Sequence, residues 1–152
     1  MDRRQFCRTV FGIGLAALAA GEGRAFTSSK ILWHKDLKTA YQVSVSRKKP
    51  MLLVFSASWC TFCHKLLRET LGEPALIAYV ERHFVPVLLD YDVDTRIAQI
   101  LEVESLPCTV VLSPQADLLL RKSGFARADA YRQMLQAALD AQQQILQAGA
   151  RE

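Results

Sequence analysis

The stretch MLLVFSASWCTFCHK, residues 51–65, places a short apolar run directly before two cysteines that are separated by two residues. The run at 51–56 has the length and composition of a strand that is buried on both faces of a sheet. The residues after it predict a helix from about Cys60 to Leu71. The sequence therefore predicts that a buried strand delivers Cys60 and Cys63 to the first turn of a helix.

This position gives the two cysteines different chemistry. The first turn of a helix presents free backbone N–H groups and the positive end of the helix dipole. Both favour the thiolate over the thiol, and the thiolate is the form that attacks. Cys63 lies one turn later and is expected to be more buried. We therefore expect Cys60 to attack a disulfide in a protein substrate and Cys63 to resolve the mixed disulfide that forms.

The same residues allow two other chemistries. With His64 included, residues 60–64 have the pattern Cys-x-x-Cys-His, which is typical of covalent c-type haem attachment. In that hypothesis His64 is the proximal iron ligand, and Met134 or His83 is the distal one. Zinc is a third hypothesis, because the motif at 60–64 and Cys108 offer sulfur and nitrogen ligands. A buried strand before the motif disfavours a mostly helical cytochrome, and Cys108 is not part of a second ligand pair. We therefore expect no haem, no metal and no other cofactor.

The composition indicates one compact domain without a nucleic-acid partner. The chain has 152 residues, of which 51% are hydrophobic and 22% are charged, and its formal net charge is +4. This length is too short to expect two domains. The only dense basic run is RKK at 47–49, which we interpret as the solvated end of a helix and not as a nucleic-acid patch.

Residues 1–25 have the anatomy of an export signal, with a basic head, a short apolar run and small residues up to Ala25. The RRQF sequence at 3–6 resembles the twin-arginine export signal, and an ordinary secretory signal is the alternative. Cleavage after about Ala25 would remove Cys7 and leave a periplasmic domain of residues 26–152. The three cysteines that remain are too few for a disulfide framework and fit a redox pair with one extra thiol.

Helices and strands alternate along the rest of the chain. We predict a helix that is capped by Asp36 and ends before Pro50, a second that opens at Pro74, a short one capped by Asp94, and a last one over 127–147. The predicted strands are 51–56, 84–91, 109–113 and 118–123, the last two joined as a hairpin by 114–117. The apolar side of the last helix is expected to be formed by Tyr131, Leu135, Leu139 and Ile145 or Leu146. Strands separated by helices imply parallel neighbours, and the hairpin adds an antiparallel strand. The prediction is an α/β fold whose mixed central sheet carries helices on both faces.

The chain resembles the thioredoxin superfamily over essentially all of residues 26–152. The resemblance is carried by LLVFSAS at 52–58, WCTFCHK at 59–65 and SLP at 105–107, followed by the hairpin, Gly124-Phe125 and the final helix. Within the superfamily the chain is similar to secreted reductase-type domains, such as the C-terminal domain of the membrane thiol:disulfide interchange protein DsbD. The segment LGEPALIAYVERHFVPVLLD and the Leu before the proline match that branch.

The resemblance implies roles for residues around the cysteines. It implies a thioredoxin fold in which Trp59 lies at the rim of the disulfide, Pro107 is the family's cis-proline and Leu106 helps to bind substrate. It also implies a thiol–disulfide oxidoreductase that acts on protein disulfides, in the reducing direction, with a membrane electron donor of the DsbD kind. The alternatives are a dithiol oxidase or isomerase and a non-catalytic metal-binding module of the same fold.

Two positions depart from the family pattern. Many members have a buried Asp five residues before the Trp, used in proton transfer to the resolving thiol, and here Val54 stands there. The residue after the cis-proline is usually Thr, and here it is Cys108, which is either a small buried residue or a third redox thiol. His64 stands where relatives often have Lys, and from the exposed side of the helix it can tune Cys60.

Overall fold

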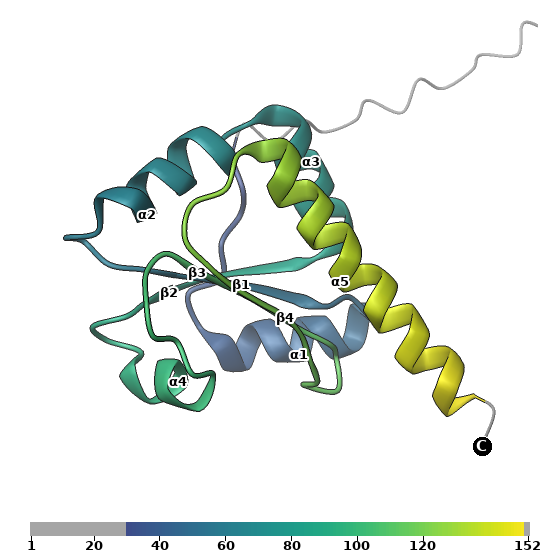
Figure 1. The fold of residues 1–152 in the computed structure, drawn as a ribbon. Coiled ribbons are helices and arrows are strands. Elements are labelled where there is room, and N and C mark those ends of the chain that lie inside the picture. The colour runs from purple at the N-terminus through teal and green to yellow at the C-terminus, as the bar shows by residue number, and fades with distance from the viewer. Residues whose placement is uncertain (1–29, 151–152) are drawn as a thin grey trace, which may run out of the picture.

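A four-stranded mixed sheet lies at the centre of the protein (Figure 1). The computed structural model describes residues 30–150, so the predicted export signal at 1–25 lies outside the described residues. The strands are β1 (Met51–Ser56), β2 (Val85–Asp90), β3 (Cys108–Leu112) and β4 (Leu118–Ser123), and their order in the sheet is β2-β1-β3-β4. The helices are α1 (Leu37–Arg47), α2 (Thr61–Lys65), the π-helix η1 (Leu66–Thr70), α3 (Pro74–His83), α4 (Thr95–Ile100) and α5 (Ala128–Gly149).

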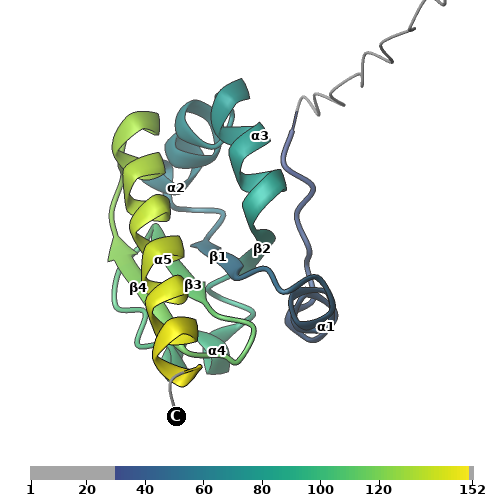
Figure 2. The same cartoon turned by 90° about the vertical axis from the view of Figure 1, so that its right-hand side faces the viewer.

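The residues of β1 alternate between the two faces of the sheet. Leu52 and Val54 point into an apolar cluster with η1, α3 and α5, whereas Met51, Leu53 and Phe55 point into a second cluster with α1 and α4. All five side chains are at most 2% exposed, and burying a side chain of this size contributes about 1.5–3 kcal/mol. The same layers are visible in Figures 1 and 2. The predicted mixed sheet with helices on both faces is confirmed.

The direction of β3 differs from the prediction. β1 and β2 are parallel, as expected for strands joined through a helix. β3 follows β2 through α4 and yet pairs antiparallel with β1, with Phe55 opposite Cys108. The reason is that α4 has only six residues and does not carry the chain back along the sheet. The chain therefore enters β3 from the edge at which β2 ends, and β4 adds the expected antiparallel hairpin.

The starts of the helices follow their predicted caps with one exception. The Asp36 carboxylate accepts a hydrogen bond from a backbone N–H of the first turn of α1 at 2.8 Å, and Pro74 is the first residue of α3. Asp94 is at the N-cap position of α4 but does not cap it with its side chain. Its carboxylate instead accepts a hydrogen bond from the Asp90 backbone N–H at 2.9 Å, which holds the turn after β2.

The predicted helix from Cys60 to Leu71 changes its winding halfway. After α2 the backbone continues as the π-helix η1, and the Leu71 N–H donates to the Leu66 carbonyl at 2.9 Å, five residues back. Gly72 then allows a close approach, since a Cβ there would lie 2.2 Å from the Arg68 carbonyl oxygen. The Thr70 hydroxyl donates to the Ala126 carbonyl at 2.6 Å and ties this wider turn to the start of α5.

The last helix is longer than its buried part. Tyr131 and Leu135 are at most 1% exposed, as predicted, whereas Ile145 and Leu146 are 46% and 54% exposed. One of these two was expected on the apolar side of the helix, and that side is not buried here because α5 extends beyond the sheet that covers its first half (Figure 1). Within residues 30–150, no helix is both long enough and apolar enough to span a bilayer.

Candidate functional site

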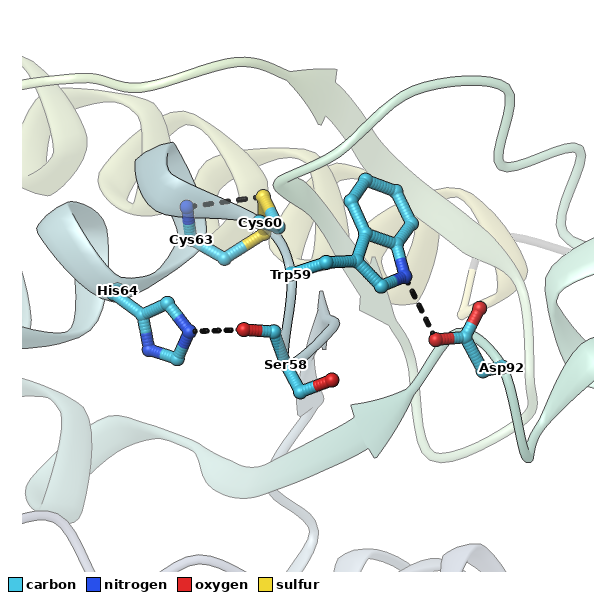
Figure 3. The surroundings of a disulfide bond; sticks show 6 residues. All are labelled: Ser58, Trp59, Cys60, Cys63, His64 and Asp92. Atoms are coloured by element: carbon cyan, nitrogen blue, oxygen red, sulfur yellow. Dashed lines mark hydrogen bonds between the residues drawn. A yellow bond between two sulfur atoms is a disulfide. The ribbon is translucent and has the colours of Figure 1, made fainter.

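Cys60 and Cys63 form a disulfide at the edge where β1 ends and α2 begins. Cys60 is the N-cap residue of α2, in an extended conformation, and its backbone N–H donates to the Ala57 carbonyl at 3.1 Å. The Cys60 sulfur accepts a hydrogen bond from the Cys63 backbone N–H at 3.2 Å (Figure 3). The predicted placement of the pair at the start of a helix is therefore observed, with a backbone donor directed at the first sulfur.

The disulfide is almost covered by protein. Cys60 is 6% exposed and Cys63 is 1% exposed, so the second sulfur is the less accessible, as predicted. Both belong to a small apolar cluster with Ala57, against which Tyr91 and Leu106 pack. A partner molecule approaching from solvent can therefore reach Cys60 before Cys63.

Trp59 lies at the rim of the disulfide and is held by a carboxylate. The side chain is 64% exposed, and its indole N–H donates to Asp92 at 2.8 Å (Figure 3). Asp92 lies in the turn after β2, where its own backbone N–H donates to the Asp90 carboxylate at 2.9 Å. Asp92 was not predicted, and only a family pattern could have indicated it, because 33 residues separate it from Trp59.

Leu106 and Pro107 lie at the end of the loop before β3. The peptide bond between them is cis, Pro107 is buried and Leu106 packs against the disulfide cluster. The Pro107 carbonyl accepts a hydrogen bond from the Gly124 N–H at 2.8 Å. Gly124 has φ of +92°, a conformation that glycine adopts without strain. The end of β4 thus fixes the loop that contacts the disulfide.

His64 is exposed and turned away from the sulfur atoms (Figure 3). One ring nitrogen, Nε2, lies 2.9 Å from the Ser58 carbonyl oxygen. Beside His64 there is a cavity of about 460 Å³ whose polar lining includes Lys35, Asp90 and Asp94. This cavity was not predicted, since its residues come from separate segments with no common spacing.

Val54 and Cys108 occupy buried positions on opposite faces of the sheet. Val54 is 0% exposed in the cluster with η1, α3 and α5, so it brings no acid beneath the cysteines. Cys108 is a free thiol, 0% exposed, in the cluster with α1 and α4. Burial raises the pKa of this thiol, although the Ser123 hydroxyl, 3.9 Å away, acts in the opposite direction. Cys108 therefore lies apart from the cluster that contains the disulfide.

Met134 and His83, the candidate distal haem ligands, make their contacts elsewhere in the fold. Met134 packs against the apolar cluster on the α3 and α5 face, and the His83 ring stacks on Tyr79 with centroids 4.7 Å apart. Cys60 and Cys63 are bonded to each other. Within the described residues, no group of three or more His, Cys, Asp or Glu is arranged to hold a metal ion.

Comparison with known proteins gives the family. A model described as "Thioredoxin-like domain" matches residues 37–139, more than half of the chain. The chain belongs to the thioredoxin-like family. This thioredoxin-like chain is 32% identical over 128 residues to "Thioredoxin-related protein DsbJ" from Chlamydia pneumoniae, a match that covers 76% of the chain and 36% of the relative. The chain thus spans well under half the length of that relative.

Solved structures show the same fold. The thioredoxin-like chain is similar to "DsbH Oxidoreductase" with a TM-score of 0.68 and 19% identity, over 80% of this chain and 92% of that one. It is similar to the oxidised C-terminal domain of DsbD from Neisseria meningitidis with a TM-score of 0.56 and 22% identity, over 67% of this chain and 98% of that one. The predicted thioredoxin fold is confirmed, and the disulfide of a Cys-x-x-Cys motif in this fold is consistent with thiol–disulfide oxidoreductase chemistry.

Proposed function

We propose that this thioredoxin-like protein is an exported thiol–disulfide oxidoreductase that reduces disulfides in protein substrates through Cys60 and Cys63. The observation that carries the proposal is the backbone N–H of Cys63, 3.2 Å from the Cys60 sulfur at the start of α2. A donor at this position, with the dipole of the helix behind it, stabilises negative charge on that sulfur.

The reaction balances as two thiol–disulfide exchanges. In the reduced protein the Cys60 thiolate attacks one sulfur of a substrate disulfide, the substrate S–S bond breaks, and the other substrate sulfur leaves as a thiolate that takes up a proton. Cys63 then loses its proton and attacks the Cys60 sulfur, which breaks the mixed disulfide and releases the second substrate thiol. Two electrons pass from the protein to the substrate, the Cys60–Cys63 disulfide forms, and the two substrate thiols receive one proton that Cys63 gives up and one from solvent.

The residues around the disulfide are proposed to hold the substrate chain. Trp59 directly precedes Cys60, Leu106 packs against the disulfide cluster from another loop, and Pro107 follows Leu106. Phe62 adds an apolar side chain that is 59% exposed. A substrate segment that packs between these loops has its disulfide presented to Cys60, the more exposed sulfur. Since Val54 provides no carboxylate, the proton of Cys63 passes to water or to the departing substrate thiolate.

The proposal also includes the direction of the reaction, the location of the protein and its electron donor. Residues 1–25 are proposed to be a twin-arginine-like export signal, cleaved after about Ala25, which leaves residues 26–152 in the periplasm. An oxidising compartment requires a dedicated electron source to keep a dithiol reduced. A membrane donor of the DsbD kind is proposed for this role, and the sequence resemblance and the likeness to the DsbD domain support it.

The test is the variant Cys63→Ser in the exported protein. Without the resolving thiol, substrates remain attached to Cys60 as mixed disulfides, which mass spectrometry after non-reducing electrophoresis identifies. Cys60→Ser and the double variant are the matched controls and trap nothing. Insulin reduction by the wild-type protein is expected to exceed its oxidation of a reduced, unfolded substrate. Faster oxidation than reduction would favour the oxidase reading, and an absence of mixed disulfides would overturn the proposal.

A further inference from the structure

A cluster of basic side chains lies along α3 and α5, away from the disulfide. A cavity of about 410 Å³ between these helices is lined by Tyr79, Arg82, His83, Arg132 and Gln136, together with two alanines of α3. His83 ends α3 just before β2, whose first residue pairs with the first residue of β1. The disulfide follows the last residue of β1, so the His83 end of the cavity lies at the opposite edge of the sheet.

The contacts in the cavity fix the positions of its side chains. The Arg132 guanidinium lies over the Tyr79 ring, 4.9 Å from its centroid, and the His83 ring stacks on the same tyrosine at 4.7 Å. The Tyr79 hydroxyl donates to the Gln136 side-chain oxygen at 2.8 Å. Tyr79 is 9% exposed and therefore acts as a fixed platform for a guanidinium and an imidazole.

Arg132 lines a neighbouring cavity together with Glu73 and Asp129, but the cations of the cluster are not ion-paired within the described residues. Within residues 30–150, neither Arg82, Arg132 nor Lys49 is in an ion pair. All three lie close enough to act on His83, whose pKa is lowered first by burial and then by these cations. The charges therefore converge from three segments: the end of α1, the end of α3 and the second turn of α5.

The nearest acidic residues are directed at other groups. The Glu73 carboxylate accepts hydrogen bonds from two backbone N–H groups at the start of α3. Asp140 accepts a hydrogen bond from Gln136 at 3.0 Å, and its charge also acts on Tyr79. Asp129, one turn before Arg132 on α5, forms no ion pair with it within the described residues.

We propose that this cavity binds a phosphate group, held by Arg82, Arg132 and His83. Guanidinium groups match the oxygens of phosphate with paired N–H donors, a geometry that a phosphate diester offers as well as the free ion. The phosphate is either free or part of an anionic lipid headgroup, and the two sources share the same chemistry. The site is separate from the proposed redox function, since its residues do not contact the disulfide.

The experiment titrates the full oxidised protein with inorganic phosphate at constant ionic strength and follows the His83 ring protons by NMR. Bound phosphate favours the protonated imidazole, so the His83 signal is expected to shift in a saturable way and to titrate at higher pH. Arg82→Gln combined with Arg132→Gln is expected to weaken binding at least about tenfold, which corresponds to about 1.4 kcal/mol. Arg96→Gln, the same change on the exposed face of α4, is the matched control and leaves binding unchanged.

A second arm distinguishes the two sources. Co-sedimentation with phosphatidylglycerol vesicles, compared with phosphatidylcholine vesicles, reports a lipid phosphate, and saturable binding of inorganic phosphate reports a free one. The double variant also loses the contact between Arg132 and Tyr79 and could unfold for that reason. In that case Arg82→Gln alone tests the site, because the Arg82 side chain is exposed and makes no structural contact in the described part of the chain. Three results would overturn the proposal: a shift of the His83 signal that sodium chloride reproduces, phosphate binding that is unchanged in the arginine variants, or no binding in either arm. Disulfide exchange by Arg82→Gln is expected to equal that of the wild type, so the two proposals fail separately.

Discussion

Cys60 and Cys108 are cysteines at the same edge of the sheet with opposite surroundings. Cys60 caps a helix, accepts a backbone hydrogen bond and borders an exposed rim that includes Trp59. Cys108 begins β3, is 0% exposed and is surrounded by apolar side chains. The environment favours charge on the first sulfur and disfavours it on the second.

The difference between Cys60 and Cys108 shows that the residues next to a cysteine in the sequence do not determine the reactivity of its thiol. Cys108 follows Pro107, a residue of the proposed substrate site, and is nevertheless directed into the core on the α1 and α4 face. Cys108 is the first residue of β3 and packs within that core, whereas Cys60 is the N-cap residue of α2 and belongs to a separate cluster. The structural reading of Cys108 as a small buried residue follows from this geometry, and the two thiols can be compared directly.

The largest expected effect is on alkylation of the reduced protein. At neutral pH under native conditions, iodoacetamide is expected to modify Cys60 at least about a hundredfold faster than Cys108, since a buried thiol reacts only when the structure opens locally. Peptide mass spectrometry measures both rates in one sample. In denaturant the two rates should become equal. Cys108 that reacts as fast as Cys60 in the native protein would identify it as an accessible third thiol.

The sequence predicted those elements whose signals are local. The β1 run, the cap at Asp36, the proline at the start of α3 and the hairpin around 114–117 depend on nearby residues, and all are observed. The placement of Cys60 at the helix start was predictable for the same reason. An apolar run does not encode the direction of its strand, however, so the antiparallel pairing of β3 with β1 was missed.

The remaining errors concern contacts between distant segments. The π-helix contains Thr70, whose hydroxyl is bonded to Ala126, 56 residues away. The apolar pattern of α5 continues past the point where the sheet ends, so periodicity alone did not show that Ile145 and Leu146 are exposed. Asp92 was missed because its partner is a tryptophan on another loop.

A smaller effect is expected when the Trp59 side chain loses its anionic acceptor. Asp92→Asn keeps the shape of the side chain but replaces a charged hydrogen bond by a neutral one, a loss of about 1 kcal/mol. If the indole must be fixed for substrate to bind beside Cys60, kcat/KM for a disulfide peptide falls about fivefold, with little change in thermal stability. In a Trp59→Phe background the Asp92→Asn change should have no further effect. An equal loss in both backgrounds would show that Asp92 acts through something other than the indole.

The smallest expected effect is on stability at alkaline pH. Because burial raises the pKa of Cys108 above the ordinary value of 9.0, the folded protein keeps a proton that the unfolded chain loses. The stabilisation from this thiol is therefore complete below about pH 9 and is lost as the pH rises toward the folded pKa, with a slope of at most about 1.4 kcal/mol per pH unit.

Urea unfolding of the oxidised protein at pH 7.5 and pH 10 (roughly one unit or more on either side of the ordinary thiol pKa) should show a smaller alkaline loss of unfolding free energy for Cys108→Ala than for the wild type. Cys108→Ser differs from Cys108→Ala in polarity but also lacks the thiol, so both variants should share one pH slope. Part of the loss persists in both, because burial also raises the pKa values of Tyr79 and Tyr131. If the unfolding free energy of the variants depends on pH as steeply as that of the wild type, Cys108 ionises as readily in the folded protein as in the unfolded chain. The surroundings of Cys108 would then not disfavour charge, and the proposed difference from Cys60 would be lost.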